Sequence, residues 1–149
     1  MLSSKKKTGN YLSKSLYIRG LQCHKSLFLQ KYDPELKDII SDSQKVIFEG
    51  GKEVGILAWQ LFPGGIEIPY EGLSLQEQLD LTQQKIQEGQ KTIYEATFSH
   101  QDVIVKVDIL HKGKMGWEIC EVQAGTIVAP VYVDDAALRY YVLTGAGLK

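Results

Sequence analysis

Three β-type runs within residues 93–125 form the clearest pattern in this chain of 149 residues. Two clusters of turn-forming residues, 99–102 and 112–116, separate the runs and predict an antiparallel meander. Two carboxylates interrupt apolar positions of this meander, Asp108 in the second run and Glu121 in the third. Burying a carboxylate is costly unless a cation meets it, so these two residues mark a candidate site.

The register of the meander decides which side chains can meet. Side chains alternate between the faces of a strand, so Lys106 shares a face with Asp108, and Glu121 shares one with Gln123. A turn centred on residues 113–114 would put Lys106 opposite Glu121 and bring Asp108, Glu121 and Gln123 to one face. Two carboxylates there offer the oxygen ligands that divalent cations prefer.

Helical patterns occupy most of the remaining chain. Asp33-Pro34 ends the first pattern, Asp42 or Ser43 is expected to cap the second, and Ser74 with Glu77 has the spacing of a capping box. A short strand is expected over residues 66–70, where Pro69 confines it to a sheet edge. The chain is therefore predicted to be α/β, a central mixed sheet flanked by helices. The expected helices cover residues 13–32, 42–62, 74–88 and 136–144.

Composition limits the classes of function. The formal net charge of -1 gives no bulk attraction to nucleic acid, so any DNA contact needs a local basic patch. Residues 1–10, with three consecutive lysines, are expected to form a flexible basic tail. No apolar run approaches the roughly 20 residues of a membrane span, and no signal peptide is evident. Two cysteines do not make a disulfide framework, which favours a cytoplasmic location.

The spacing of Asp108, twelve residues, then Glu121-Val122-Gln123 resembles the Asp and Glu-x-Lys motif of the PD-(D/E)XK nuclease superfamily. The resemblance extends to three further blocks, which are YLSKSLYIRGLQCHKSLFL near the start, FEGGKEVGILAWQLFPGG in the middle and VDDAALRYYVLTGAGL at the end. Together these blocks are similar to a bacterial family of the RecB-like branch, which includes the CRISPR-associated RecB-type exonucleases.

This resemblance implies a restriction-endonuclease-like fold over residues 11–149 and metal-dependent hydrolysis of DNA. Asp108 and Glu121 would be ligands of Mg2+ or Mn2+, an ion that polarises the scissile phosphate and activates a water. Gln123 stands at the position of the motif Lys. It can hydrogen-bond a water but brings no positive charge, and Lys106 on the same face is the candidate to replace that charge.

The resemblance also identifies two further departures. Many RecB-like nucleases carry a metal-binding His where this chain has Gly55. Glu49, Glu53 and Glu95 are the alternatives for the missing ligand. We include Glu95, with Asp108 and Glu121, among the predicted metal ligands. Related nucleases with an iron-sulfur cluster use an early Cys and three later ones. This chain has only Cys23 and Cys120, so a complete cluster is not expected.

In the RecB-like branch, the helix after the Glu-x-Lys strand lines the DNA channel. Arg139, Tyr140 and Tyr141 are the local counterparts and are expected to bind nucleic acid; the alternative for both tyrosines is packing on the sheet. A restriction-endonuclease-like sheet adds further strands after this helix. Because the chain ends at Lys149, we expect a truncated protein, an excised N-terminal domain or a reduced family member.

Three hypotheses of function follow. The first is a Mg- or Mn-dependent nuclease acting on DNA. The second is a catalytically inactive nucleic-acid-binding or assembly module that keeps the nuclease fold. The third is purely structural, with Asp108 and Glu121 salt-bridged to Lys106 and Arg139. A protein partner and a homo-oligomer are both left open.

Overall fold

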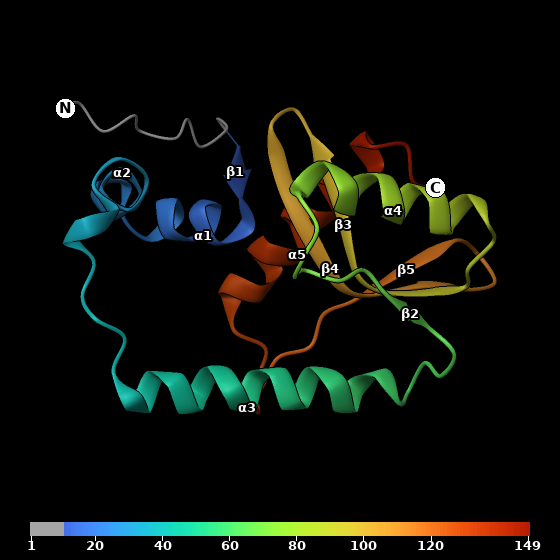
Figure 1. Ribbon diagram of the computed structural model, residues 1–149, viewed down its shortest axis with the longest axis horizontal. Helices are drawn as coiled ribbons and strands as arrows, with labels where there is room; N and C mark the ends of the chain where they lie inside the picture. The colour runs from blue at the N-terminus through green and yellow to red at the C-terminus, as the bar shows by residue number, and fades with distance from the viewer. Residues whose placement is uncertain (1–10) are drawn as a thin grey trace.

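The computed structural model describes residues 11–149, so the expected basic tail at residues 1–10 lies outside the described part of the chain. Within that part, a mixed sheet is flanked by helices, which makes the protein α/β (Figure 1). The elements are β1 Leu12–Ser13, α1 Lys14–Gln22, α2 His24–Tyr32, the 3-10 helix η1 Pro34–Leu36, α3 Asp42–Trp59, β2 Ile66–Glu67, α4 Leu75–Gln87, β3 Thr92–His100, β4 Val103–Lys112, β5 Trp117–Cys120 and α5 Pro130–Gly145.

The sheet confirms the predicted meander. β3 pairs antiparallel with β4, and β4 pairs antiparallel with β5. The strand order is β1-β4-β3-β2, with β1 parallel to β4 and β2 parallel to β3. β2 therefore lies at a sheet edge, as Pro69 predicted. β1 was not predicted, because two residues are too short to show a periodic pattern.

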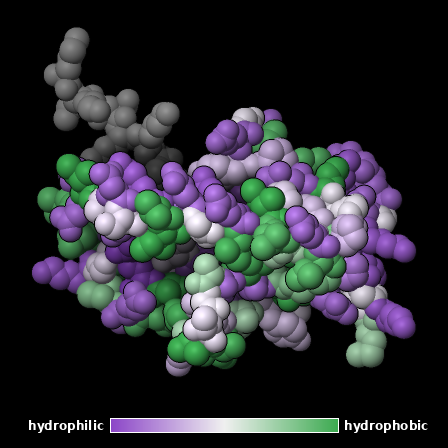
Figure 2. Space-filling model, turned by 90° about the horizontal axis from the view of Figure 1, so that it is seen from below, coloured by the Kyte–Doolittle hydropathy of each residue, from purple (hydrophilic) through white to green (hydrophobic). Residues whose placement is uncertain are grey.

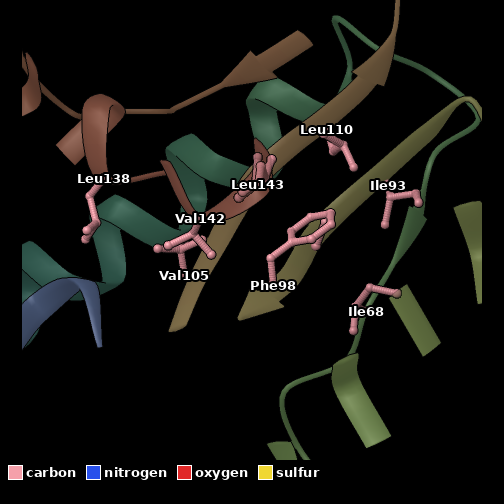
Figure 3. Close-up of a cluster of buried hydrophobic side chains, with 10 residues drawn as sticks. Ile68, Ile93, Phe98, Val105, Leu110, Leu138, Val142 and Leu143 are labelled. Carbon is pink, nitrogen blue, oxygen red and sulfur yellow. The ribbon is translucent and has the colours of Figure 1, made fainter. Parts of the chain in front are cut away.

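The hydrophobic core lies between the meander and helix α5 (Figure 3). Val142 and Leu143 of α5 are almost completely buried, as are Val105 of β4 and Phe98 of β3. Ile68, just after β2, extends the core towards the edge of the sheet. Packing α5 against β3 and β4 fixes the helix over the part of the meander that carries the acidic residues.

The first and last predicted helices differ from the structure. The pattern over 13–32 is two helices, because Cys23 is extended (φ -163°, ψ 111°) and exposed between them. The last helix begins at Pro130, six residues earlier than expected. Proline suits the first turn of a helix, where its missing N–H has no partner to lose. Asp135, which directly precedes the expected helix, is consequently buried inside α5.

Helix α3 forms a separate layer on one side of the sheet (Figure 1). Ser41 and Gln44 form a capping box at its start, so the cap lies one residue earlier than expected. None of its 18 residues is buried, and Val46, Ile47 and Phe48 are exposed. Its end is fixed to β3, where Trp59 stacks on Tyr94 at a ring separation of 4.4 Å. Among the helices of residues 11–149, none has the length and apolar character to cross a membrane.

Candidate functional site

Strands β3 and β4 are distorted where their acidic residues lie. Ile93 and Ala96 both join the hydrophobic core, and so do Val107 and Leu110. Residues three apart point to opposite faces of a regular strand, so each strand changes face between these positions. Glu95 occupies the change in β3 with a φ of 55°, a backbone conformation that is uncommon for residues other than glycine. Strain of this kind is found most often at functional sites.

The distortion lines up three carboxylates across neighbouring strands. The β3–β4 register places Glu95 opposite Asp108, between the pairs Tyr94–Ile109 and Ala96–Val107. On the other side of β4, Glu121 directly follows Cys120, which pairs with Ile109. Asp108 is therefore the middle member of a row from β3 through β4 to the end of β5.

The predicted register of the second turn was wrong by two residues. Leu110, not Asp108, lies opposite Ile119, and the pairing ends at Cys120. Lys106 is consequently not opposite Glu121. The physical reason is that the turn holds residues 113–116, closed by a hydrogen bond from the Gly113 N–H to the Gly116 carbonyl. The corrected register brings Glu121 closer to Asp108 than the prediction did.

Glu121 ends a buried chain of charges. Arg139 of α5, with 2% of its side chain exposed, places its Nη2 2.6 Å from Glu121 Oε2. The same guanidinium pairs with Asp135 and donates from Nε to the Lys106 carbonyl at 2.9 Å. Lys14 at the start of α1 meets the other oxygen of Asp135 at 3.1 Å. The chain of contacts thus links α1, α5 and the carboxylate row.

Burial and mutual repulsion change the protonation of the row. Burial, with the charge of Asp108 as the next cause, raises the pKa of Glu121 to about 9, although Arg139 opposes the shift. Burial and Asp108 also raise the pKa of Glu95. Asp108 accepts a 2.7 Å hydrogen bond from the Val122 N–H. Neither Glu121 oxygen accepts a well-aligned hydrogen bond within the described residues. Glu121 therefore has a cation beside it, Arg139, but no well-aligned hydrogen-bond donor within the described residues.

A cavity of about 850 Å3 opens beside Glu95 and Asp108, between α3 and the sheet. Its lining is mixed, with four carboxylates, two lysines and an apolar wall that includes Trp59. Gly51 and Gly55 face it from α3, and a Cβ at either glycine would meet no atom within 4 Å. Gly50 and Gly51 both face open space, so close packing does not account for this pair of glycines. The charged lining residues are Lys52, Glu67, Glu71, Glu95, Lys106 and Asp108.

Lys106 lies in this cavity with Asp108, as their shared strand face predicted. Its Nζ sits 4.6 Å from the ring centre of Tyr70, a cation–π contact. Burial lowers the pKa of Lys106, while the charges of Glu95 and Glu67 act in the opposite direction. The ammonium group is thus held in the cavity by an aromatic ring and by two nearby acidic residues.

The remaining predicted residues lie elsewhere. Gln123 is exposed beyond the end of β5 and does not line the cavity. Arg139 was expected to contact nucleic acid, but it is buried among Glu121 and Asp135 and cannot reach a ligand in this arrangement. Tyr140 is exposed, so it does not pack on the sheet. Tyr141 donates to Gln101 at the tip of the β3–β4 hairpin, at 2.6 Å.

Sequence reasoning missed three contributors. Glu67 lies between two isoleucines on β2, the same interruption of an apolar run that singled out Asp108. Tyr70 follows Pro69 and had no comparable signal. Asp135 was missed because the early start of α5 was not predicted, so this residue lay outside the expected helix. Of the alternatives for the missing ligand, Glu95 lines the cavity and Glu49 and Glu53 do not.

In the arrangement shown by residues 11–149, no three His, Cys, Asp or Glu side chains converge closely enough to hold a metal ion. Glu121 forms an ion pair with Arg139, as the structural hypothesis expected. Asp108 forms no ion pair with Lys106 in the described residues; its Oδ2 accepts the Val122 N–H instead.

A scan against protein-family models finds no match for this chain, and searches of the curated proteins and of the solved structures find none either. The RecB-like resemblance therefore stays a prediction from the sequence.

Proposed function

We propose that the cavity beside Asp108 is the site of a divalent-cation-dependent phosphodiesterase that acts on DNA. The observation that carries this proposal is the row of Glu95, Asp108 and Glu121, with raised pKa values at both ends. Within this row, Glu95 and Asp108 line the cavity and Glu121 does not. An acidic group with a raised pKa in a cleft, as Glu95 is, is a candidate for function. The position of Gly55 adds support, because the place where the resemblance expects a metal-binding His lines the same cavity.

The chemistry of the donor set fits Mg2+ or Mn2+. Carboxylate oxygens are the ligands that these ions prefer, and the Glu121 oxygens have no well-aligned hydrogen-bond donor. The cavity lining carries four carboxylates against two lysines, so a phosphate would be repelled unless a cation accompanied it. When bound, such an ion would polarise the phosphate and lower the pKa of a water.

The residues of this proposed site would then have distinct roles. Asp108 and Glu95 provide oxygens, and Glu121 provides more once its proton and its contact with Arg139 are given up. Lys106 offsets the negative charge that develops on the phosphate, the role that Gln123 cannot take. Tyr70 holds the Lys106 ammonium in the cavity through the cation–π contact. Arg139 acts through Glu121 and is a positioning residue.

Calorimetric titration with Mn2+ and Mg2+ tests the proposal. Asp108→Ala and Glu121→Ala are each expected to weaken binding by more than about tenfold, because each removes an oxygen ligand. Glu118→Ala, at an exposed position of β5, is the matched control and should bind as the wild type does. A wild-type protein that binds neither ion at millimolar concentration would refute the proposal.

Two substitutions sharpen the test. Lys106→Met should reduce cleavage of single-stranded DNA by about 100-fold or more while leaving Mn2+ binding in place, whereas Lys114→Met in the exposed turn should change neither. Gly55→His would add a nitrogen ligand where there is room for it, so Mn2+ binding should strengthen. Gly50→His is its control, since Gly50 has the same open surroundings but does not line the cavity.

The second candidate is a module that binds nucleic acid without cleaving it. It is favoured by the 2.6 Å contact between Arg139 and Glu121. The Arg139 guanidinium occupies the carboxylate that a metal ion would have to bind. The two candidates differ in one result. DNA binding with no cleavage in Mn2+, both in the wild type and in Gly55→His, would favour the module.

A further inference from the structure

A second cavity, of about 400 Å3, lies against helices α1 and α2 and shares no lining residue with the cavity beside Asp108. Its walls come from the start of the described chain, from both helices and from the segment just after η1. The volume falls within the range of small-molecule sites in proteins. The lining residues that matter for its chemistry are Tyr11, Ser13, Ser15, Arg19, Lys31 and Lys37.

Among residues 11–149, the charged side chains that line this cavity are all positive. They are Arg19, Lys31 and Lys37. Within residues 11–149 none of these three cations forms an ion pair, in contrast to Lys14, Lys45, Lys85 and Arg139. Residues 1–10 contain no Asp or Glu either, so they have no side chain that could neutralise the cavity. Like charges gathered without a partner favour the binding of an anion.

The donors of the cavity are partly fixed in place. Arg19 is half-buried, and its Nη1 donates to the Ser26 hydroxyl at 2.8 Å, which orients the guanidinium and leaves its other N–H groups free. Ser13 Oγ accepts from the Leu16 N–H at 3.3 Å, so the Ser13 hydroxyl proton is still available to donate. A planar guanidinium with free N–H groups matches the paired oxygens of a phosphate.

Tyr11 adds an aromatic surface to the same wall. It lines the cavity and is 42% exposed. Aromatic rings beside basic groups are the usual way in which proteins hold single nucleotides of a strand, the ring stacking on the base and the cations on the phosphate. We propose that this cavity binds the phosphate group of a nucleotide, with Arg19, Lys31 and Lys37 on the phosphate and Tyr11 beneath the base. The inference does not depend on cleavage at Asp108.

Binding to the full chain is measured with three probes at 100 mM salt: pyrophosphate and AMP by calorimetry, and a fluorescein-labelled 12-nucleotide single-stranded DNA by anisotropy. The double variant Lys31→Ala/Lys37→Ala should weaken the binding of every probe that the wild type holds by about tenfold or more. Lys25→Ala, an exposed lysine of α2 outside the cavity, is the control and should cost less than about twofold. Tyr11→Ala should weaken AMP and DNA but leave pyrophosphate unchanged.

The probes separate the sources of the phosphate. Binding of pyrophosphate and AMP without DNA identifies a free nucleotide as the ligand, and DNA binding that pyrophosphate displaces identifies a strand; both outcomes support the site. The lysines at residues 5–7 are present in every variant, so differences between variants report on the cavity alone. No binding of any probe, or an equal loss in Lys25→Ala, would overturn the proposal.

Thermal melting by circular dichroism checks that the variants fold. Asp108→Ala should keep the binding of these probes whatever its effect on Mn2+ binding.

Discussion

Burial, followed by the charge of Asp108, raises the pKa of both acidic neighbours of Asp108, Glu95 and Glu121. Three carboxylates across adjacent strands would be unfavourable if all were ionised, because like charges in a partly buried place cannot be screened well. At Glu121, burial is the largest cause and the charge of Asp108 the next, and together they raise its pKa to about 9. A divalent cation would release that proton on binding, so its apparent affinity should rise as the pH increases.

The raised pKa of Glu121 also makes a prediction for stability. A carboxyl whose pKa is higher in the folded state stabilises the fold fully below its unfolded pKa, near 4.5. That contribution is lost as the pH rises towards about 9. Glu121→Gln cannot ionise, so the variant should gain stability relative to the wild type over this range, by at most about 1.4 kcal/mol per pH unit.

Urea denaturation of both proteins at pH 5.5, 7 and 8.5 measures this difference. Glu118→Gln, an exposed substitution on the same strand, is the control and should follow the wild type at every pH. A difference between Glu121→Gln and the wild type that does not change with pH would show that Glu121 is not protonated in the folded state.

At the scale of elements, Tyr94 makes several of the contacts that join the end of α3 to the sheet. The Tyr94 hydroxyl donates to the Phe62 carbonyl at 2.6 Å and accepts from the Gly65 N–H at 3.2 Å. Its ring stacks on Trp59. Gly65 has to be glycine because a Cβ there would overlap the Tyr94 ring. These contacts set the position of the cavity wall relative to Glu95, the next residue along β3.

Tyr94→Phe should therefore destabilise the protein by about 1–3 kcal/mol, since it leaves partly buried backbone groups without a partner. Tyr17→Phe is the matched control, because the Tyr17 hydroxyl makes no hydrogen bond within the described residues and should be replaceable at little cost. Chemical denaturation measures both. Equal stabilities of the two variants would mean that the Tyr94 hydroxyl does not fix α3.

The elements also show what the sequence could predict and where it could not. Strong local patterns were sufficient for the meander, for the capping box of Ser74 and for the edge position of β2. The shared face of Lys106 and Asp108 was likewise predictable, because it depends only on strand alternation. The turn register was not, since the hydrogen bond that closes residues 113–116 has no periodic signal. The burial of Arg139 was missed because it results from packing between α5 and β4.

At the scale of the whole molecule, two parts of residues 11–149 contrast: the sheet with α5 is firmly packed, whereas α3 forms a layer without a buried residue. The core residues come from β3, β4, α5 and the residue after β2, while α3 contributes none. Figure 2, which views the molecule from the side of α3, shows hydrophobic residues at the surface among hydrophilic ones. The cavity beside Asp108 lies between these two parts, so one wall is rigid and the other can move.

Hydrogen exchange followed by mass spectrometry should separate the two parts. The amides of α3 are expected to exchange at least about 100-fold faster than those of β3 and β4, because a helix without buried residues opens without unfolding the core. Dilution over a tenfold range of protein concentration is the control, since contact between copies would slow exchange only in the concentrated sample. If α3 were as protected as β4 at every concentration, the cavity would be enclosed by two rigid walls. If instead Mn2+ slowed exchange at residues 51–59 in the wild type but not in Asp108→Ala, ion binding and the position of α3 would be coupled through the cavity that they share.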